Sequence, residues 1–207
     1  MDAYTASYHP KAGDVVWDVG AHAGMSAFFL SQMVGPDGKV YAFEPDDTNF
    51  EYLLRNIELH KLANVTPVKA ALSGTTGTAT FSMDGSMGAG LSTFQVHSES
   101  TYYKEVETLT LKDACGRLGQ IPNYIKADIE GAELELVESS LEFLKIHPIN
   151  LVFESNHIVN GRLTSESLDP MLVSAGYRAW SSDEFGQRFT WAEPQTVHGT
   201  ERSSLVR

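Results

Sequence analysis

Residues 13–45 constrain the fold of this 207-residue chain more than any other part of it. A short apolar run over residues 15–17 leads into the turn Asp18-Val19-Gly20-Ala21-His22-Ala23-Gly24, which an apolar helical stretch follows. A second apolar run over residues 40–43 ends on Glu44. This order of strand, glycine-bearing turn, helix, strand and acid is typical of the nucleoside-binding half of an open α/β sheet, where ligands bind beyond the carboxyl ends of the strands.

The turn itself narrows the choice of nucleoside. A dinucleotide fingerprint, G-x-G-x-x-G, needs its second glycine so that the backbone can approach a pyrophosphate. Here His22 stands at that position and the next glycine is Gly24. A D-x-G-x-x-x-G turn with Glu44 after the next strand instead suits a ligand that has an amino-acid tail and no phosphates. S-adenosyl-L-methionine is such a ligand, because its sulfonium and ammonium groups complement Asp18 and Glu44. A NAD-type ligand is the alternative.

Length and composition favour one enzyme-sized domain. A hydrophobic content of 42% in 207 residues supports one buried core and is short for two, so we expect a single domain over residues 1–207, with residues 1–12 as a short N-terminal extension. The net charge of −12 argues against nucleic acid as a partner. One cysteine and no signal or membrane segment predict a cytoplasmic protein without a membrane partner. The oligomeric state stays open.

Helical and strand patterns alternate along the chain, which predicts a doubly wound α/β sheet. Strands or extended segments are expected after residue 60 at 65–72, 78–83, 105–111, 124–128, 149–154, 177–181 and 188–191. Helices are expected at 24–33, 49–62, 112–118, 131–144 and 165–175. The Gly/Ser-rich segment 84–101 has no periodicity and is a candidate lid or substrate loop.

Four motifs give the chain a family resemblance between residues 13 and 154. They are the turn from Asp18 to Gly24, Phe43-Glu44-Pro45, Ala71-Leu72-Ser73 and Ile125-Lys126-Ala127-Asp128-Ile129-Glu130-Gly131-Ala132-Glu133. With these motifs the chain resembles the FkbM-type S-adenosylmethionine-dependent methyltransferases, in which Asn commonly stands where His22 stands here. The resemblance implies a single Rossmann-like class I methyltransferase sheet of seven strands in the order 3-2-1-4-5-7-6, with the last strand antiparallel. It also implies O-methylation of a hydroxyl on a small molecule or sugar-containing metabolite, with S-adenosyl-L-homocysteine as the product.

The candidates for cofactor binding lie in the first turn and at the ends of the predicted strands. Glu44 is expected to bind the ribose, because residues 46–48 already supply caps for the following helix. The glycines make the tight turn, and Ser73 follows the third strand, where adenine would lie. The full set of cofactor-binding candidates is Asp18, Gly20, His22, Gly24, Glu44, Pro45, Ser73 and Asp128.

The catalytic candidates are Asp128, Glu130 and His157. Asp128 and Glu130 straddle the end of the fourth strand, where the transferred methyl group should point. Asp128 can hold the methionine ammonium or orient the acceptor, and Glu130 can take the acceptor's proton, although two acids before a helix can also simply favour its N-terminus. His157 follows the fifth strand and is a candidate base. Glu154 and Asp128 could instead share a divalent cation, but no third acid is clearly placed, so no metal is expected.

These candidates predict an in-line displacement at the sulfonium methyl, with most of the rate gain from holding the reacting atoms in line. Two rivals share the nucleoside-binding half. A NAD(P)-dependent oxidoreductase should show the third glycine and a catalytic Tyr-x-x-x-Lys, and Tyr124 has Asp128 four residues on instead. A non-catalytic nucleoside-binding module should lack the acids after the fourth strand, and this chain has them.

Overall fold

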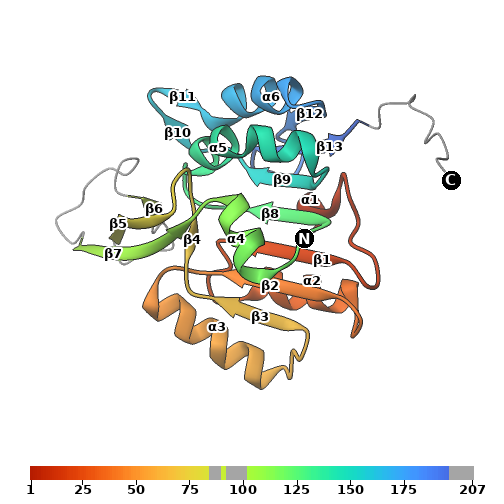
Figure 1. Cartoon of the computed structure of the whole chain (residues 1–207), viewed down its shortest axis with the longest axis vertical. Coiled ribbons are helices and arrows are strands. Elements are labelled where there is room, and N and C mark those ends of the chain that lie inside the picture. Colours follow the sequence, from red (N-terminus) through yellow and green to blue (C-terminus); the bar gives the residue numbers. More distant parts are fainter. Residues whose placement is uncertain (84–89, 92–101, 196–207) are drawn as a thin grey trace, which may run out of the picture.

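A seven-stranded sheet forms the centre of the computed structural model, which describes residues 1–83, 90–91 and 102–195 (Figure 1). Its strands, in spatial order, are β3 (Val65–Val68), β2 (Lys39–Phe43), β1 (Val15–Val19), β8 (Tyr124–Ala127), β9 (Asn150–Glu154), β13 (Phe189–Pro194) and β12 (Tyr177–Ser182). The first five run parallel, and β13 is antiparallel to both of its neighbours. Counted along the chain, this order is 3-2-1-4-5-7-6 with the last strand antiparallel, so the predicted topology is confirmed.

Helices cover both faces of this sheet. One face packs against α1 (Asp2–Thr5), α2 (Met25–Val34) and α3 (Asp47–Leu59). The other packs against α4 (Leu111–Leu118), α5 (Glu133–Ile146) and α6 (Thr164–Ser174). Successive residues of β1 serve opposite faces, because Val16 belongs to the first core and Trp17 to the second, and both are fully buried. A strand buried on both sides must be apolar throughout, which explains the continuous runs in the sequence.

The predicted third strand over residues 65–72 is wrong in its second half. Strand β3 ends at Val68, and β4 (Ala71–Leu72) leaves the central sheet for a second, four-stranded one. The Ala70 N–H donates to the Val68 carbonyl at 3.0 Å, and this tight turn redirects the chain so that β4 pairs with β7 (Tyr102–Leu109). The remaining strands of the second sheet are β5 (Gly77–Met83) and β6 (Gly90–Leu91).

The second sheet also bears on two other predicted segments, residues 105–111 and 84–101. The extended segment predicted to reach residue 111 ends at Leu109, because the Thr110 side chain accepts a hydrogen bond from the Asp113 N–H and caps α4. Apart from β6, the candidate lid 84–101 lies outside the described residues, so its role stays a prediction.

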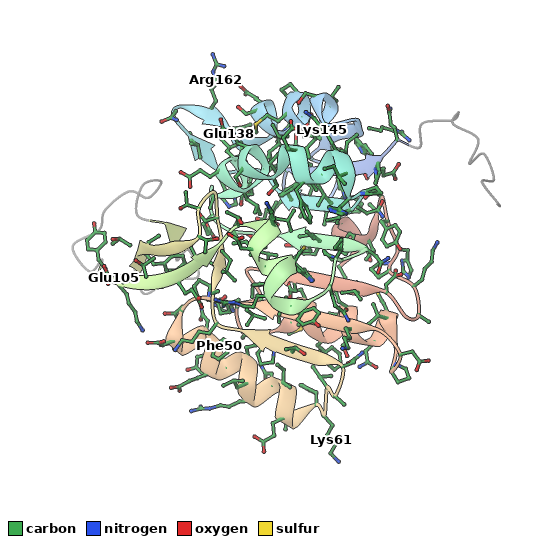
Figure 2. All side chains as sticks on the ribbon, in the orientation of Figure 1. Phe50, Lys61, Glu105, Glu138, Lys145 and Arg162 are labelled. Atoms are coloured by element: carbon green, nitrogen blue, oxygen red, sulfur yellow. The ribbon has the colours of Figure 1, made fainter. Side chains whose placement is uncertain are left out.

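Most charged side chains of the described residues lie on the outside of the molecule. Figure 2 shows Lys61 and Arg162 pointing away from the body, and both are exposed, as are Glu105 and Glu138. In the part of the chain that the structure describes, no helix combines the length and apolar character needed to cross a membrane. The unusual groups are therefore the few charged residues that are buried, and they gather at one edge of the sheet.

Candidate functional site

A cavity of about 730 Å³ opens where β1, β2, β8 and β9 end, and residues of the second sheet complete its wall. Six of the predicted site residues line it: Gly20, His22, Glu44, Pro45, Asp128 and Glu130. The other lining residues are Val19, Phe43, Asn49, Ala70, Ala71, Leu72, Phe81, Ile129, Ala132, Glu154 and Gln187. The cavity therefore joins the two strand ends on which the sequence places the cofactor and the reaction.

Glu44 is a buried carboxylate held by backbone donors. Only 5% of the residue is exposed, and its two oxygens accept hydrogen bonds from the N–H groups of His22 at 2.8 Å and Asp46 at 2.9 Å. Burial raises the pKa of Glu44 to about 7, against the lowering effect of these two donors. His22 donates from a left-handed backbone with a φ of 50°, a conformation that costs energy for a residue other than glycine. The first turn is thus shaped to hold this acid.

Gly20 lets the first turn approach the end of β8. Its φ is 74°, and a Cβ atom there would lie 1.9 Å from the backbone oxygen of Asp128. Gly24, with a φ of 89°, begins α2, and a Cβ there would lie 2.6 Å from Leu53 Cδ1. Gly20 therefore belongs to the cavity wall, whereas Gly24 allows α2 to pack against α3 and is not among the lining residues.

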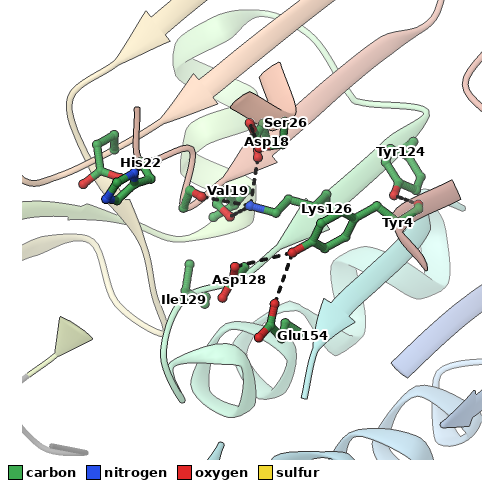
Figure 3. A network of polar contacts seen from close by, with 12 residues as sticks. Tyr4, Asp18, Val19, His22, Ser26, Tyr124, Lys126, Asp128, Ile129 and Glu154 are labelled. Carbon is green, nitrogen blue, oxygen red and sulfur yellow. Dashed lines mark hydrogen bonds and ion pairs between the residues drawn. The ribbon is translucent and has the colours of Figure 1, made fainter. Parts of the chain in front are cut away.

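Asp18 lies behind the cavity wall in a buried ion pair (Figure 3). Its Oδ1 is 3.0 Å from Lys126 Nζ, and its Oδ2 accepts a hydrogen bond from Ser26 Oγ at 2.6 Å. Lys126 Nζ also donates to the Gly20 carbonyl at 2.8 Å. Burial lowers the pKa of Lys126, but the carboxylates of Asp18 and Asp128 outweigh it and the net pKa is raised. The pair braces the first turn, and direct contact between Asp18 and the cofactor stays a prediction.

Lys126 is a site residue that sequence reasoning missed. The signal was present in Ile125-Lys126-Ala127, because a lysine inside a buried apolar strand needs a partner to be stable there. Alternation along β8 puts Lys126 on the same face as Asp128.

His157 lies between two carboxylates just outside the lining residues. Its Nε2 is 3.5 Å from Glu130 Oε2, and its Nδ1 is 3.2 Å from Oε1 of the fully buried Glu133. Burial acts to lower the pKa of His157, but Glu133 and Glu130 raise it to about 9. At neutral pH the ring is therefore an imidazolium, which favours a role as a charge partner over the general base considered from the sequence. Glu130, like His22, adopts a positive φ, of 55°.

Asp128 and Glu154 complete the acidic end of the cavity. Tyr4 Oη donates to Glu154 Oε2 at 3.1 Å and lies 3.5 Å from Asp128 Oδ2. Burial and the neighbouring Asp128 carboxylate raise the pKa of Glu154. One potential ligand atom from each of Asp128, Glu154 and His157 lies within 4.8 Å of the others, a spacing that a divalent cation could bridge. The prediction of a metal-free site therefore stays a prediction.

Ser73 is buried but is not among the lining residues. Its N–H donates to the Leu109 carbonyl at 3.0 Å, which joins β4 to the end of β7. Its neighbours Ala71 and Leu72 line the cavity instead. The end of β4 therefore offers an apolar wall, and direct contact between Ser73 and adenine stays a prediction.

Comparisons with known proteins agree with this arrangement. Residues 18–179 match the methyltransferase FkbM domain. The chain is 30% identical over 150 residues to the hexuronic acid methyltransferase AglP of Haloferax volcanii, covering 70% of this chain and 56% of AglP. The chain thus spans about half the length of this curated relative.

Solved structures of methyltransferases share the fold. An FkbM methyltransferase from Methylobacillus flagellatus matches 91% of this chain and 45% of its own, with a TM-score of 0.63 and 16% identity. A fibrillarin from Aeropyrum pernix, solved with bound S-adenosyl-L-methionine, matches 88% of this chain and 67% of its own, with a TM-score of 0.54 and 14% identity. With the domain match covering most of its length, the chain belongs to the FkbM family of S-adenosylmethionine-dependent methyltransferases.

Proposed function

We propose that the chain binds S-adenosyl-L-methionine in the cavity and methylates a hydroxyl group of a sugar-containing small molecule. The observation that carries this proposal is the buried Glu44 carboxylate at the end of β2, in the same cavity as Asp128 and Glu130. Each oxygen of Glu44 accepts one backbone hydrogen bond, and the Asn49 side chain also donates to this carboxylate. A carboxylate has about four lone pairs, so Glu44 keeps acceptor capacity for a ribose hydroxyl.

The rest of the cavity suits the remaining parts of this cofactor. Phe43, Ala71 and Leu72 offer apolar surface for an adenine ring. At the other end, the carboxylates of Asp128 and Glu154 complement the positive sulfonium and ammonium groups. The lining of the cavity thus fits a ligand that is neutral and flat at one end and positively charged at the other.

The bound cofactor would supply a methyl group whose carbon an oxygen nucleophile can attack, with the positively charged sulfur as the leaving atom. In our proposal Asp128 would hold the methionine ammonium, and Glu130 would accept the proton of the acceptor hydroxyl. Burial raises the pKa of Glu130, which makes it a stronger base than an exposed glutamate. His157, held by Glu133, fixes the position of the Glu130 carboxylate. Most of the rate gain comes from alignment of the reacting atoms.

Two observations support the proposed class of acceptor: the name of the relative AglP and the net charge of the chain. AglP is named a hexuronic acid methyltransferase, which supports a sugar-type acceptor here. The net charge of −12 disfavours an RNA acceptor, because phosphate contacts need clustered Lys and Arg. A single cytoplasmic domain that acts on small molecules is the organisation we propose.

Calorimetry on the purified protein tests the cofactor assignment. We expect S-adenosyl-L-methionine and S-adenosyl-L-homocysteine to bind, and NADH and ATP not to bind. Binding of NADH alone would move the chain to the oxidoreductases. Formation of S-adenosyl-L-homocysteine with a panel of paired neutral pyranosides and hexuronic acids then tests the acceptor, and methylation of neither member of any pair would reject the sugar class.

A further inference from the structure

The N-terminal helix α1 brings Tyr4 to the acidic end of the cavity (Figure 3). The Tyr4 hydroxyl is the group that lies between the carboxylates of Glu154 and Asp128, at 3.1 Å and 3.5 Å. From the sequence, residues 1–12 were expected only as a short extension. In the structure, this segment supplies a side chain to the carboxylates of the proposed transfer site.

Helix α1 is fixed to the sheet on both sides of this side chain. Trp191 Nε1 donates to the Ala3 carbonyl at 2.7 Å, and the Tyr124 hydroxyl donates to the Tyr4 carbonyl. The Tyr4 ring packs edge-on against Phe189, with ring centroids 5.3 Å apart. These contacts come from β8 and β13, so the sheet that carries the carboxylates also sets the reach of the phenol.

The backbone and side chain of Tyr4 lie along one face of β8. Tyr124 and Lys126 alternate along the strand, and Asp128, the residue that follows it, continues this alternation, so all three point to this face. The Tyr4 backbone meets Tyr124, its ring lies 5.5 Å from Lys126 Nζ, and its hydroxyl reaches Asp128. Burial and the carboxylates of Asp128 and Glu154 raise the pKa of Tyr4 well above its usual value. The phenol therefore stays protonated and acts as a donor.

We propose that Tyr4 is a positioning residue of the transfer site, which holds the Asp128 and Glu154 carboxylates against the cavity wall and makes α1 part of the active site. The inference rests on the proposed function, because it assigns Asp128 to the methionine ammonium. Two neighbouring carboxylates repel each other, and a donor placed between them reduces the repulsion and restricts their rotation. Without the hydroxyl, Asp128 is free to turn away from the ammonium.

A double-mutant cycle tests whether Tyr4 acts through Asp128. Affinity for S-adenosyl-L-methionine is measured by calorimetry for wild type, Tyr4→Phe, Asp128→Asn and the double variant, with displacement of S-adenosyl-L-homocysteine for weak binders. We expect Tyr4→Phe to weaken binding about tenfold in the wild type, and less than about twofold when Asp128 is already Asn. A merely structural role would cost the same factor in both backgrounds.

Tyr8→Phe is the matched control. Tyr8 lies on the same segment, stacks on Tyr124 at 5.7 Å between ring centroids, and donates to Asp14 Oδ2 at 2.7 Å, but neither Tyr8 nor Asp14 lines the cavity. Both variants lose one phenol–carboxylate hydrogen bond, so we expect similar falls in melting temperature, with wild-type affinity in Tyr8→Phe.

Three outcomes overturn the inference: Tyr4→Phe affinity within twofold of wild type, an equal loss in both backgrounds, or an equal loss in Tyr8→Phe. If wild type itself binds neither adenosyl compound, the proposed function fails, and the inference falls with it. The wild-type titration therefore separates failure of the function from failure of the positioning role.

Discussion

The two ends of the cavity are built in different ways. At the cofactor end, Gly20, His22 and Glu44 belong to one strand–turn–helix–strand unit, and backbone N–H groups hold the acid. At the transfer end, side chains hold other side chains, and Tyr4 and Glu154 are in contact although 150 residues separate them in the sequence. The comparison indicates that local chain geometry positions Glu44, whereas the packing of the whole domain positions the carboxylates at the transfer end.

Gly20→Ala should disrupt both ends of the cavity, because Gly20 lies where the first turn contacts the backbone of Asp128. A Cβ atom would lie 1.9 Å from the Asp128 backbone oxygen, on a backbone with a φ of 74°. We expect the free energy of unfolding to fall by about 3 kcal/mol and binding of S-adenosyl-L-methionine to be lost, from overpacking and left-handed strain together. Denaturant unfolding and calorimetry measure these losses.

Gly13→Ala is the control for Gly20→Ala. Gly13 has a φ of 88°, but a Cβ atom there would meet nothing within 4 Å, so only the backbone strain of about 1 kcal/mol should remain. Equal losses in the two variants would show that the close approach to β8 does not matter.

Glu130→Gln should affect the transfer end alone. With an acceptor from the panel, we expect turnover to fall about 100-fold, since a general base is removed, while affinity for the cofactor stays within twofold. Glu138→Gln, an exposed position on α5, should change neither quantity. Turnover of Glu130→Gln at the wild-type rate would contradict the assignment of the base.

Glu44→Gln should affect the cofactor end alone. Replacing a buried charged acceptor by an amide should weaken binding of S-adenosyl-L-homocysteine about 30-fold, with little change in turnover at saturating cofactor. Glu51→Gln is the control, because Glu51 is exposed on α3 and pairs only with Arg55 among the ion pairs of the described residues. Unchanged affinity in Glu44→Gln would remove Glu44 from the ribose site.

The pH dependence of binding should come from the cofactor end. Ribose hydroxyls donate to the ionised form of Glu44, whose pKa burial raises from 4.5 to about 7. Affinity for S-adenosyl-L-methionine should therefore be constant above pH 7 and fall towards tenfold per pH unit below it. Because the folded pKa is the higher one, the stability that Glu44 contributes in the absence of ligand is present below pH 4.5 and is lost as the pH rises through 7.

Calorimetry measures the affinity and denaturant unfolding measures the stability between about pH 5 and pH 8. The difference between the pH profiles of wild type and Glu44→Gln isolates the contribution of this carboxyl group. An identical pH slope in the two proteins would show that another group controls binding.

The difference between the two ends of the cavity also explains which residues the sequence could predict. Glu44 and Gly20 were predictable because their signals lie within short segments, and the alternation of helices and strands predicted a doubly wound sheet. The order of its strands came from the family resemblance. Tyr4 gave no signal, because its role depends on where α1 packs against β8 and β13. Lys126 gave a signal in its buried strand that was missed.

Two predictions depended on contacts that periodicity does not contain. The run over residues 65–72 is apolar enough for one strand, but pairing with β7 pulls β4 into the second sheet. Asp18 stands in the first turn as a cofactor ligand would, and its position in the motif did not indicate the ion pair that it forms with Lys126. Motif position shows that a residue belongs to the turn, and tertiary packing decides which way its side chain faces.

The decisive measurement is a crystal structure of the complex with S-adenosyl-L-homocysteine. We expect both ribose hydroxyls to donate to Glu44 and the sulfur to face Asp128 and Glu130, with Tyr4 still bonded to the carboxylates. A ribose bound away from Glu44, or a sulfur that faces away from these acids, would contradict the proposed site.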